Sequence, residues 1–352
     1  MARVIGSAMP THGPKYSKDK SNPQGLTTKY RQQAKNSTDA VLPMRLGGTS
    51  ALSMEPIHRL FFSFFGHNRC FIRGCGPYPN PMLFSILISI HHATAPDDLD
   101  CCLKSLVNQQ LRGQQIVLVR DGPIQPAVEK CIEKYTTDLP FEHLNYAENR
   151  GLGPALRDGL GACAHEIVAR VDSDDRSLPE RFALQTAFLE EHDTVSVVGG
   201  WMTEHYQQGG LPSTYVRETP IDPTTVAHYA RRRNPLNHPT VMFRKSHVLA
   251  SGGYQPCLMF EDYFLWARML AKGYRLANMP RVLVETQIDP TYFTRRGGIG
   301  YLRHEIVLLA KLRELGFFSQ VDAAIFILTR LPIRIMPVNF REYLYRSLLR
   351  SQ

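Results

Sequence analysis

The stretch EIVARVDSDDRSLPERF, residues 166–182, places three aspartates within four positions, directly after an apolar run. The run that ends at Val171 is typical of a buried strand, and the residues after the aspartates have helical character. Crowded carboxylates repel one another unless a cation or hydrogen-bond donors share the site. Two interpretations follow for Asp172, Asp174 and Asp175: a ligand site, or a solvated acidic turn in which one of them caps the next helix.

The chain before this stretch alternates between short apolar runs and amphipathic segments. The pattern predicts strands over 84–90, 114–123, 141–147 and 165–172, separated by helices over 96–110, 127–135 and 153–163. Such an alternation predicts an α/β fold with a parallel, doubly wound sheet. Ligands of these sheets bind outside the carboxyl ends of the strands.

Polar residues gather at those predicted strand ends. Asp121 follows the second strand, the segment 148–150 (Glu-Asn-Arg) follows the third, and the aspartates of 172–175 follow the fourth. Because the carboxyl ends of parallel strands share one edge of the sheet, these groups are expected to form one site. The solvated-turn interpretation is weakened accordingly.

Composition and charge exclude several classes of protein. The chain has 352 residues, a hydrophobic fraction of 43% and a net charge of +9. Residues 1–81 carry 11 lysines and arginines against 3 acids, residues 295–352 carry 10 against 4, and the middle carries 20 against 25. An acidic centre argues against nucleic-acid binding. No apolar run is long enough to span a membrane, and the seven cysteines lack metal-type spacing, which suggests reduced thiols and the cytosol.

Seven motifs, in order, resemble the nucleotide-sugar-dependent glycosyltransferases of family 2, which have the GT-A fold. They are FSILISI, VLVRDGP, ENRGLGPALRDGL, ARVDSDD, NHPTVMFRKS, GGYQPCLMFEDYFLWARMLAKGY and TRRGG, spread from about residue 84 to 311. Bacterial enzymes that assemble capsular or exopolysaccharide repeat units are the most similar in character. The resemblance implies an inverting, hexosyltransferase-type enzyme that moves a sugar from a nucleotide-diphosphate donor, with UDP favoured, to a saccharide or lipid-linked saccharide.

The resemblance also assigns roles around the donor. Asp172 and Asp174 match the family's Asp-x-Asp pair, which implies Mn²⁺ or Mg²⁺ held by Asp174, with Asp172 facing the ribose or the metal's water shell. Asp175 is expected to cap a helix that begins near Leu178. Asp121 matches the aspartate that binds the base or ribose, and an Asp-Gly turn is its alternative.

The flanking motifs supply further candidates. Asn149 and Arg150 are candidate nucleotide contacts, with helix capping as the alternative for Asn149. His238 is a candidate contact to the acceptor or the diphosphate, or else a core histidine. Arg295 and Arg296 are either a mobile clamp on the diphosphate oxygens or plain surface residues.

A general base is needed on the acceptor side, because a sugar hydroxyl is a poor nucleophile until its proton is removed. Asp262, in FEDYFLW, is the predicted base, and Glu261 is predicted to orient it or to contact the acceptor. A helix whose first turn carries favourable acids is the alternative for both residues.

Other functions fit the sequence less well. A sugar-nucleotide nucleotidyltransferase would carry a glycine-rich basic loop after the first strand, where this chain has HHATAPDD. A non-catalytic nucleotide-sugar-binding protein would have lost the paired acids. A dehydrogenase is unsupported, because no G-x-G-x-x-G follows a strand.

Three regions are expected along the chain. Residues 1–81 form a basic, disordered or weakly ordered extension, 82–310 the glycosyltransferase domain, and 311–352 a basic amphipathic helical segment. In 323–350, apolar residues are interleaved with arginines, and two prolines exclude one straight helix. This segment is predicted either to lie on the cytoplasmic face of the inner membrane, with arginines reaching the headgroups, or to pack on the domain. The protein is therefore expected to be cytoplasmic, with possible peripheral membrane contact.

Overall fold

The structure is a computed structural model that describes residues 82–208, 211–288, 292, 296–337 and 340. The expectations for 1–81, for Arg295 and for most of 338–352 lie outside the described residues. The described residues all belong to one compact unit. Five cysteines of the described residues are free thiols: Cys101, Cys102, Cys131, Cys163 and Cys257.

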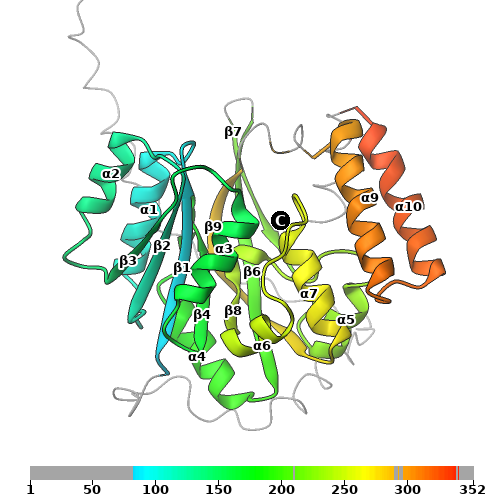
Figure 1. The fold of residues 1–352 in the computed structure, drawn as a ribbon, viewed down its shortest axis with the longest axis horizontal. Coiled ribbons are helices and arrows are strands. Elements are labelled where there is room, and N and C mark those ends of the chain that lie inside the picture. The colour runs from blue at the N-terminus through cyan, green and yellow to red at the C-terminus, as the bar shows by residue number, and fades with distance from the viewer. Residues whose placement is uncertain (1–81, 209–210, 289–291, 293–295, 338–339, 341–352) are drawn as a thin grey trace, which may run out of the picture. The chain divides into compact units, whose positions relative to one another are not determined.

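The first half of this unit has the predicted alternation of strands and helices (Figure 1). Its elements are β1 (Phe84–His91), α1 (Pro96–Val107), β2 (Gln115–Asp121), α2 (Pro126–Glu133), β3 (Phe141–Asn145), α3 (Leu152–Ala162) and β4 (Ile167–Asp172). Strands β1 to β4 are mutually parallel in the order β3-β2-β1-β4. The predicted doubly wound α/β arrangement is confirmed.

The second half adds antiparallel strands to the same sheet. It contains β5 (Asp175–Ser177), α4 (Arg181–Glu191), β6 (Val195–Gln208), β7 (Leu211–Arg217), α5 (Pro223–Tyr229), the 3₁₀ turn η1 (His238–Thr240), β8 (Met242–Arg244), α6 (Lys245–Ala250), α7 (Glu261–Ala271) and β9 (Arg275–Ile288). Beyond β4 the order continues β8-β6-β9-β5, and β7 pairs with β6. Strand β8 is antiparallel to β4 and β6, whereas β6 and β9 are parallel.

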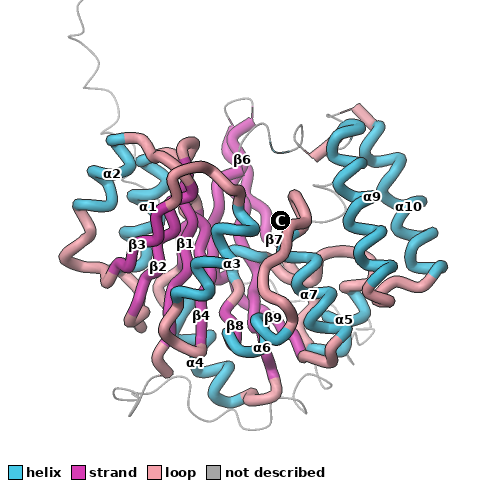
Figure 2. The backbone as a smooth tube through the Cα atoms, viewed as in Figure 1, coloured by secondary structure: helices cyan, strands magenta, loops and turns pink. Residues whose placement is uncertain are grey.

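Alternating residues of the central strands face two helical layers, which Figure 2 shows flanking the strands. Ile86 and Ile88 of β1 pack in a cluster with α1, α2 and α4. Leu87, between them, packs in a second cluster with α3, α6 and α7. This period of two is what a strand buried on both faces requires. The register sets His91 opposite Asp121 and Ser89 opposite Asp172, so the strand ends share one edge.

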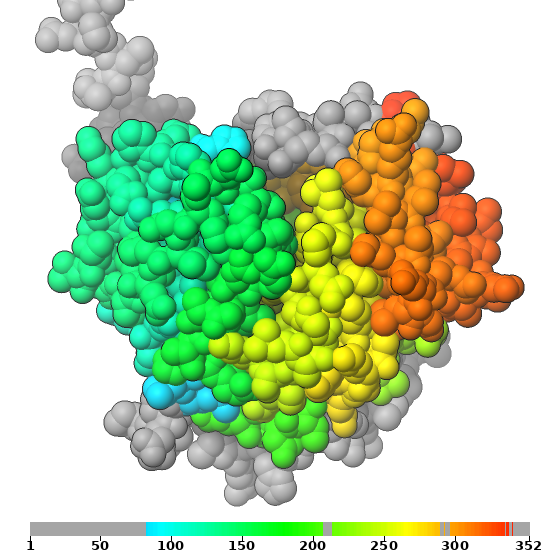
Figure 3. Space-filling view, viewed as in Figure 1, coloured from blue at the N-terminus to red at the C-terminus, as the bar shows by residue number. Residues whose placement is uncertain are grey.

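Two antiparallel helices follow the sheet, α9 (Gly298–Glu314) and α10 (Gln320–Ile335). Figure 3 shows them side by side at the margin of the described unit, with α7 next to α9. An aromatic-rich cluster fixes them to α7 through Phe260, Tyr301, Phe318 and Phe326. Helix α9 runs through the boundary predicted at 310–311, and α10 continues past Pro332 before it ends ahead of Pro337. None of the described helices is long and apolar enough to cross a membrane.

Candidate functional site

The three aspartates after β4 converge at the shared strand edge. Asp172 is the last residue of β4, Asp174 lies in the following turn, and Asp175 is the first residue of β5. One carboxylate oxygen from each lies within 4.8 Å of the other two. Asp175 is buried and faces Thr286 of β9, while α4 begins only at Arg181, so the expectation that Asp175 caps the next helix is wrong. The antiparallel β5–β9 pairing instead places Asp175 in a strand, and the helix begins at Arg181 rather than near Leu178.

The electrostatics of this cluster favour the uptake of positive charge. Burial and the Asp172 charge raise the pKa of Asp174 to about 6, even though Asp174 keeps an exposed surface. The same two causes, with Asp174 added, raise the pKa of Asp175 well above its usual value. Like charges held this close resist simultaneous ionisation. A hard divalent cation prefers such carboxylate oxygens, so the donor set fits Mg²⁺ or Mn²⁺.

Two buried arginines lie beneath the aspartates, and sequence reasoning missed both. Arg170 of β4 pairs through two nitrogens with the carboxylate of Asp172. Arg181 of α4 donates to the Arg170 carbonyl oxygen at 2.7 Å and to the Ser177 hydroxyl at 3.0 Å. Burial lowers the pKa of Arg181 to about 9. Only Arg170 has a signal in the sequence, because it is a charged residue inside an otherwise apolar strand.

Asp121 organises the loop that leads into α3. Its two carboxylate oxygens accept the backbone N–H groups of Arg150 (2.7 Å) and Gly151 (2.8 Å), and the Asn149 side chain donates to its carbonyl oxygen at 3.0 Å. Gly122 has φ +87°, and a Cβ there would lie 2.7 Å from the Asn149 nitrogen. The N-cap of α3 is Gly151, so Asn149 does not cap that helix.

Arg150 is held beside this loop by its own contacts. Its guanidinium lies 4.3 Å from the centre of the Tyr146 ring and 3.1 Å from a carboxylate oxygen of Asp158. Tyr146 donates its hydroxyl to the same Asp158 oxygen at 2.8 Å. Arg150 therefore stands at the strand edge with a fixed, positively charged side chain.

Glu261 and Asp262 begin α7, and Asp262 is held from two sides. Asn234 donates to one carboxylate oxygen of Asp262 at 2.5 Å, and the backbone N–H of Tyr263 donates to the other at 2.7 Å. Burial raises the pKa of Asp262, although both donors and the charges of Arg170 and Arg217 act in the opposite direction. Asn234 was missed because nothing in RRRNPLNHP separates it from an ordinary loop residue.

The start of α7 lies against the start of α3. A Cβ added at Gly153 would meet the Cγ of Glu261 at 3.2 Å, which shows how closely the two segments approach. Burial also raises the pKa of Glu261. Met259, two residues before Glu261, has φ +70°, a backbone conformation that residues other than glycine rarely adopt. The predicted acceptor-side acids thus stand beside the loop organised by Asp121.

His238 and Arg296 are the remaining predicted residues that the structure describes. The Nε2 atom of His238 lies 2.9 Å from the Tyr254 hydroxyl, and burial, with the Arg170 charge, lowers its pKa well below the usual value. Its imidazole is therefore neutral at physiological pH. The guanidinium of Arg296 lies 4.0 Å from the Tyr292 ring centre, and its carbonyl oxygen accepts a hydrogen bond from Arg334 at 2.9 Å.

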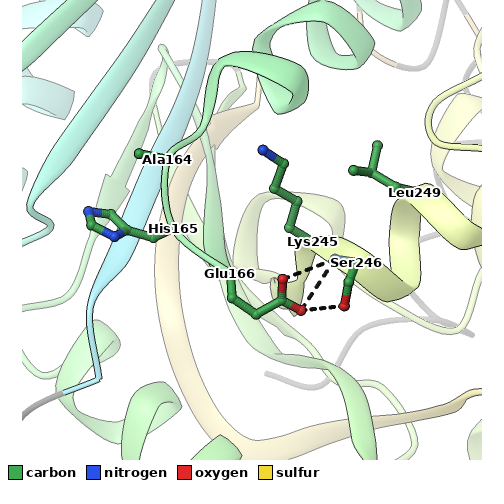
Figure 4. A pocket seen from close by; sticks show the side chains of 6 residues that line it. All are labelled: Ala164, His165, Glu166, Lys245, Ser246 and Leu249. Atoms are coloured by element: carbon green, nitrogen blue, oxygen red, sulfur yellow. Dashed lines mark hydrogen bonds between the residues drawn. The ribbon is translucent and has the colours of Figure 1, made fainter.

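A shallow hollow lies at the opposite edge of the sheet and is separate from this site (Figure 4). The carboxylate of Glu166, just before β4, accepts hydrogen bonds from the backbone N–H and hydroxyl of Ser246. Lys245 donates to the Cys163 carbonyl oxygen at 2.5 Å. Because Glu166, Ser246 and Lys245 are already hydrogen-bonded within the fold, the hollow offers no convergent set of reactive groups. Its lining consists of Ala164, His165, Glu166, Lys245, Ser246 and Leu249.

Comparisons with known proteins converge on one family. Residues 85–250 match the family described as "Glycosyl transferase family 2". The chain is 35% identical over 268 residues to an amylovoran biosynthesis glycosyltransferase of Erwinia amylovora, covering 75% of this chain and 98% of that one. It is 31% identical, with coverage of 76% and 96%, to an Escherichia coli UDP-Gal:alpha-D-GlcNAc-diphosphoundecaprenol beta-1,3-galactosyltransferase.

Solved structures share the fold at low sequence identity. The crystal structure of TarS residues 1–349 from S. aureus, in complex with UDP-GlcNAc, superposes with a TM-score of 0.54 at 18% identity. The match covers 70% of this chain and 71% of that one. The architecture described above is therefore that of GT-A-type glycosyltransferases.

Proposed function

Because the chain belongs to glycosyl transferase family 2, we propose that it transfers a hexosyl group from a nucleotide-diphosphate sugar to a saccharide or lipid-linked saccharide in surface polysaccharide synthesis. The observation that carries the proposal is the gathering of the aspartates after β4, the Asp121 loop and Asp262 at one edge of the sheet. A UDP-sugar is the favoured donor. Support comes from the E. coli relative, whose name specifies UDP-Gal.

The donor would bind across the ends of β2 and β4. Asp174, with Asp172, would hold Mn²⁺ or Mg²⁺, and such an ion offsets the negative charge that develops on the departing diphosphate. Asp121, Asn149 and Arg150 would contact the nucleotide, with Asp121 fixing the loop at the N-terminus of α3. Arg295 and Arg296 would clamp the diphosphate oxygens.

Asp262 would act as the general base in a single inverting displacement. Its carboxylate takes the proton of an acceptor hydroxyl while that oxygen bonds to the anomeric carbon, and the bond from that carbon to the diphosphate oxygen breaks. Burial raises the pKa of Asp262, which makes it a stronger proton acceptor than an exposed aspartate. Asn234 would orient this carboxylate by donating a hydrogen bond to Oδ2, while the backbone N–H of Tyr263 donates to Oδ1. Glu261 and neutral His238 would contact the acceptor.

A lipid-linked acceptor would place the enzyme at the cytoplasmic face of the inner membrane. The E. coli relative is named for a diphosphoundecaprenol-linked substrate, in which the sugar is attached to a membrane lipid. An enzyme without a described membrane-spanning helix would reach such an acceptor by peripheral contact.

A panel of UDP-, GDP- and dTDP-sugars tests this function. We expect nucleotide release from one UDP-sugar in the presence of Mn²⁺, together with a product of inverted anomeric configuration when a saccharide acceptor is supplied. Nucleotide release only in reactions of a nucleoside triphosphate with a sugar phosphate would identify a nucleotidyltransferase instead. A retained anomeric configuration would rule out the displacement by Asp262.

A further inference from the structure

Helix α10 presents a face without charge to the solvent. Val321, Ala324, Leu328 and Leu331 follow one another at helical spacing and form what we call the outer face of α10. Val321, Leu328 and Leu331 are 66%, 73% and 40% exposed. A helix on the surface of a water-soluble domain normally turns polar residues outward, so this face has the opposite pattern.

The charged residues of α10 point toward the protein body. Arg334, which is almost fully buried, donates to both carboxylate oxygens of Glu305 on α9, and Arg330 donates to the same carboxylate at 2.8 Å. Asp322 pairs with Arg231 at 3.2 Å and with Arg232 at 2.6 Å. No other charged residue lies within α10. Arg330 and Arg334 therefore contact Glu305 rather than solvent, as in the alternative in which this segment packs on the domain.

Exposed apolar residues concentrate in this hairpin. Eight of the thirteen large apolar residues that are exposed in the described part of the chain lie between residues 299 and 340. Scattered exposed leucines are ordinary, but a gathered set marks a surface that meets something apolar. The eight are Ile299, Ile306, Val307, Val321, Ile327, Leu328, Leu331 and Phe340.

Basic side chains lie beside this apolar surface, at the end of the hairpin where α9 leads into α10, and form what we call the basic rim. Residues 296–337 contain six arginines and lysines against three acids. Two of these acids are paired, Glu305 with Arg330 and Arg334, and Asp322 with Arg231 and Arg232. Arg231 and Arg232, whose side chains are 46% and 39% exposed, lie at the first turn of α10, and Arg313 lies in the last turn of α9. An apolar surface with a basic rim matches the boundary between acyl chains and anionic headgroups.

We propose that the outer face of α10 lies in the interface of an anionic lipid bilayer, with its leucine and valine side chains in the acyl region and the basic rim at the headgroups. The inference deepens the proposed function, because it assigns the surface that brings the site to a lipid-linked acceptor. Since the inserted groups are apolar, salt weakens only the contribution of the rim. Binding to vesicles therefore persists at moderate ionic strength in this proposal.

Vesicle sedimentation of the full chain, without donor or acceptor, tests the proposal. With vesicles of phosphatidylethanolamine and phosphatidylglycerol, Leu328→Glu should lower the partition coefficient at least about tenfold, because one leucine leaves the acyl region. Leu249→Glu, at a 45% exposed leucine on α6, is the matched control and should bind like the wild type. Vesicles of phosphatidylcholine alone should bind the wild type less.

Two results would overturn the proposal. The first is equal vesicle binding by wild type and Leu328→Glu, which would also be the outcome if another segment of the chain covered this face. The second is a dimer in light scattering without vesicles that Leu328→Glu converts to a monomer, which would assign the face to a second copy. Nucleotide release from UDP-sugars by the same variants keeps the two proposals separate. If no nucleotide is released while Leu328→Glu still weakens vesicle binding, the result counts against the enzyme function alone.

Discussion

The acids after β4 and the acids of the α9–α10 hairpin are the same chemical groups in opposite electrostatic settings. Asp174 and Asp175 crowd against Asp172, and burial with like charge raises the pKa of both. In the hairpin, Glu305 accepts hydrogen bonds from two arginines and Asp322 pairs with two more. These partners lower the pKa of Glu305 and Asp322, even though burial alone would raise it.

The difference distinguishes a ligand site from a structural contact. A carboxylate whose pKa is lowered already has its positive partners in the fold, and its removal costs stability. A carboxylate whose pKa is raised by neighbouring acids lacks enough positive charge around it and gains from a cation or a proton. On this criterion Asp174 is a candidate cation ligand, whereas Glu305 and Asp322 hold α9 and α10 in place.

The largest expected effect is that of Asp262→Asn. The amide keeps the shape of the side chain but cannot take a proton, so kcat should fall by roughly 10²–10⁴, the usual share of general base catalysis. The dissociation constant for the donor should stay unchanged in calorimetry, because the base contacts the acceptor. Asp138→Asn, at an exposed turn aspartate, serves as the control. Full activity of Asp262→Asn would move the base to another residue.

Asp174→Asn should lower activity without lowering stability. Loss of the proposed metal ligand should lower the rate by ~10²–10³-fold, the size seen when one group that stabilises a developing charge is removed. The melting temperature should stay the same or rise, because one of three repelling carboxylates is gone. Treatment of the wild type with EDTA should reproduce the loss of rate. A fall in melting temperature like that of a structural ion pair would contradict the contrast drawn above.

Glu305→Gln should show the reverse pattern. Glu305 is 1% exposed and carries the charge that Arg330 and Arg334 need, so its loss leaves a buried arginine without its counter-charge. Breaking such a pair costs about 3–5 kcal/mol in the free energy of unfolding, measurable by urea titration. Nucleotide release per folded molecule should stay near the wild-type value. Unchanged stability would show that Glu305 does not hold α9 and α10 in place.

The smallest effect is a difference in pH dependence. Asp322 has a lowered pKa in the folded state, so its stabilisation is present above the ordinary value of 3.8 and is lost as the pH falls through the folded value. Asp174 has a raised pKa of about 6, so its contribution is present at low pH and is lost as the pH rises through that value. Asp322→Asn should therefore flatten the stability curve only at acidic pH. Melting curves across the pH range measure this: the variant should melt below the wild type at neutral pH and close to it at the most acidic pH. A deficit of equal size at both ends of the range would contradict the assignment.

The sequence predicted the frame of the site because period-two apolar runs and helical spacing are local properties. The four parallel strands, and the acids at their ends, follow from them. Arg170 has a signal in the sequence, a charge within an apolar strand, but its contacts and those of Arg181 were not predictable, because they depend on the packing of β4 against α4. The orientation of α10 was not predictable for a similar reason. A helix with both leucines and arginines can turn either set inward, and only the position of Glu305 on α9 decides it.

The most direct test of the central claim is calorimetric titration of UDP into the wild type and Asp174→Asn, each with Mn²⁺ and with EDTA. The claim is that the aspartates after β4 hold a divalent cation for a nucleotide diphosphate. It predicts UDP binding by the wild type with Mn²⁺, and much weaker binding after chelation or in the variant. Equal UDP affinity in all four titrations would contradict it.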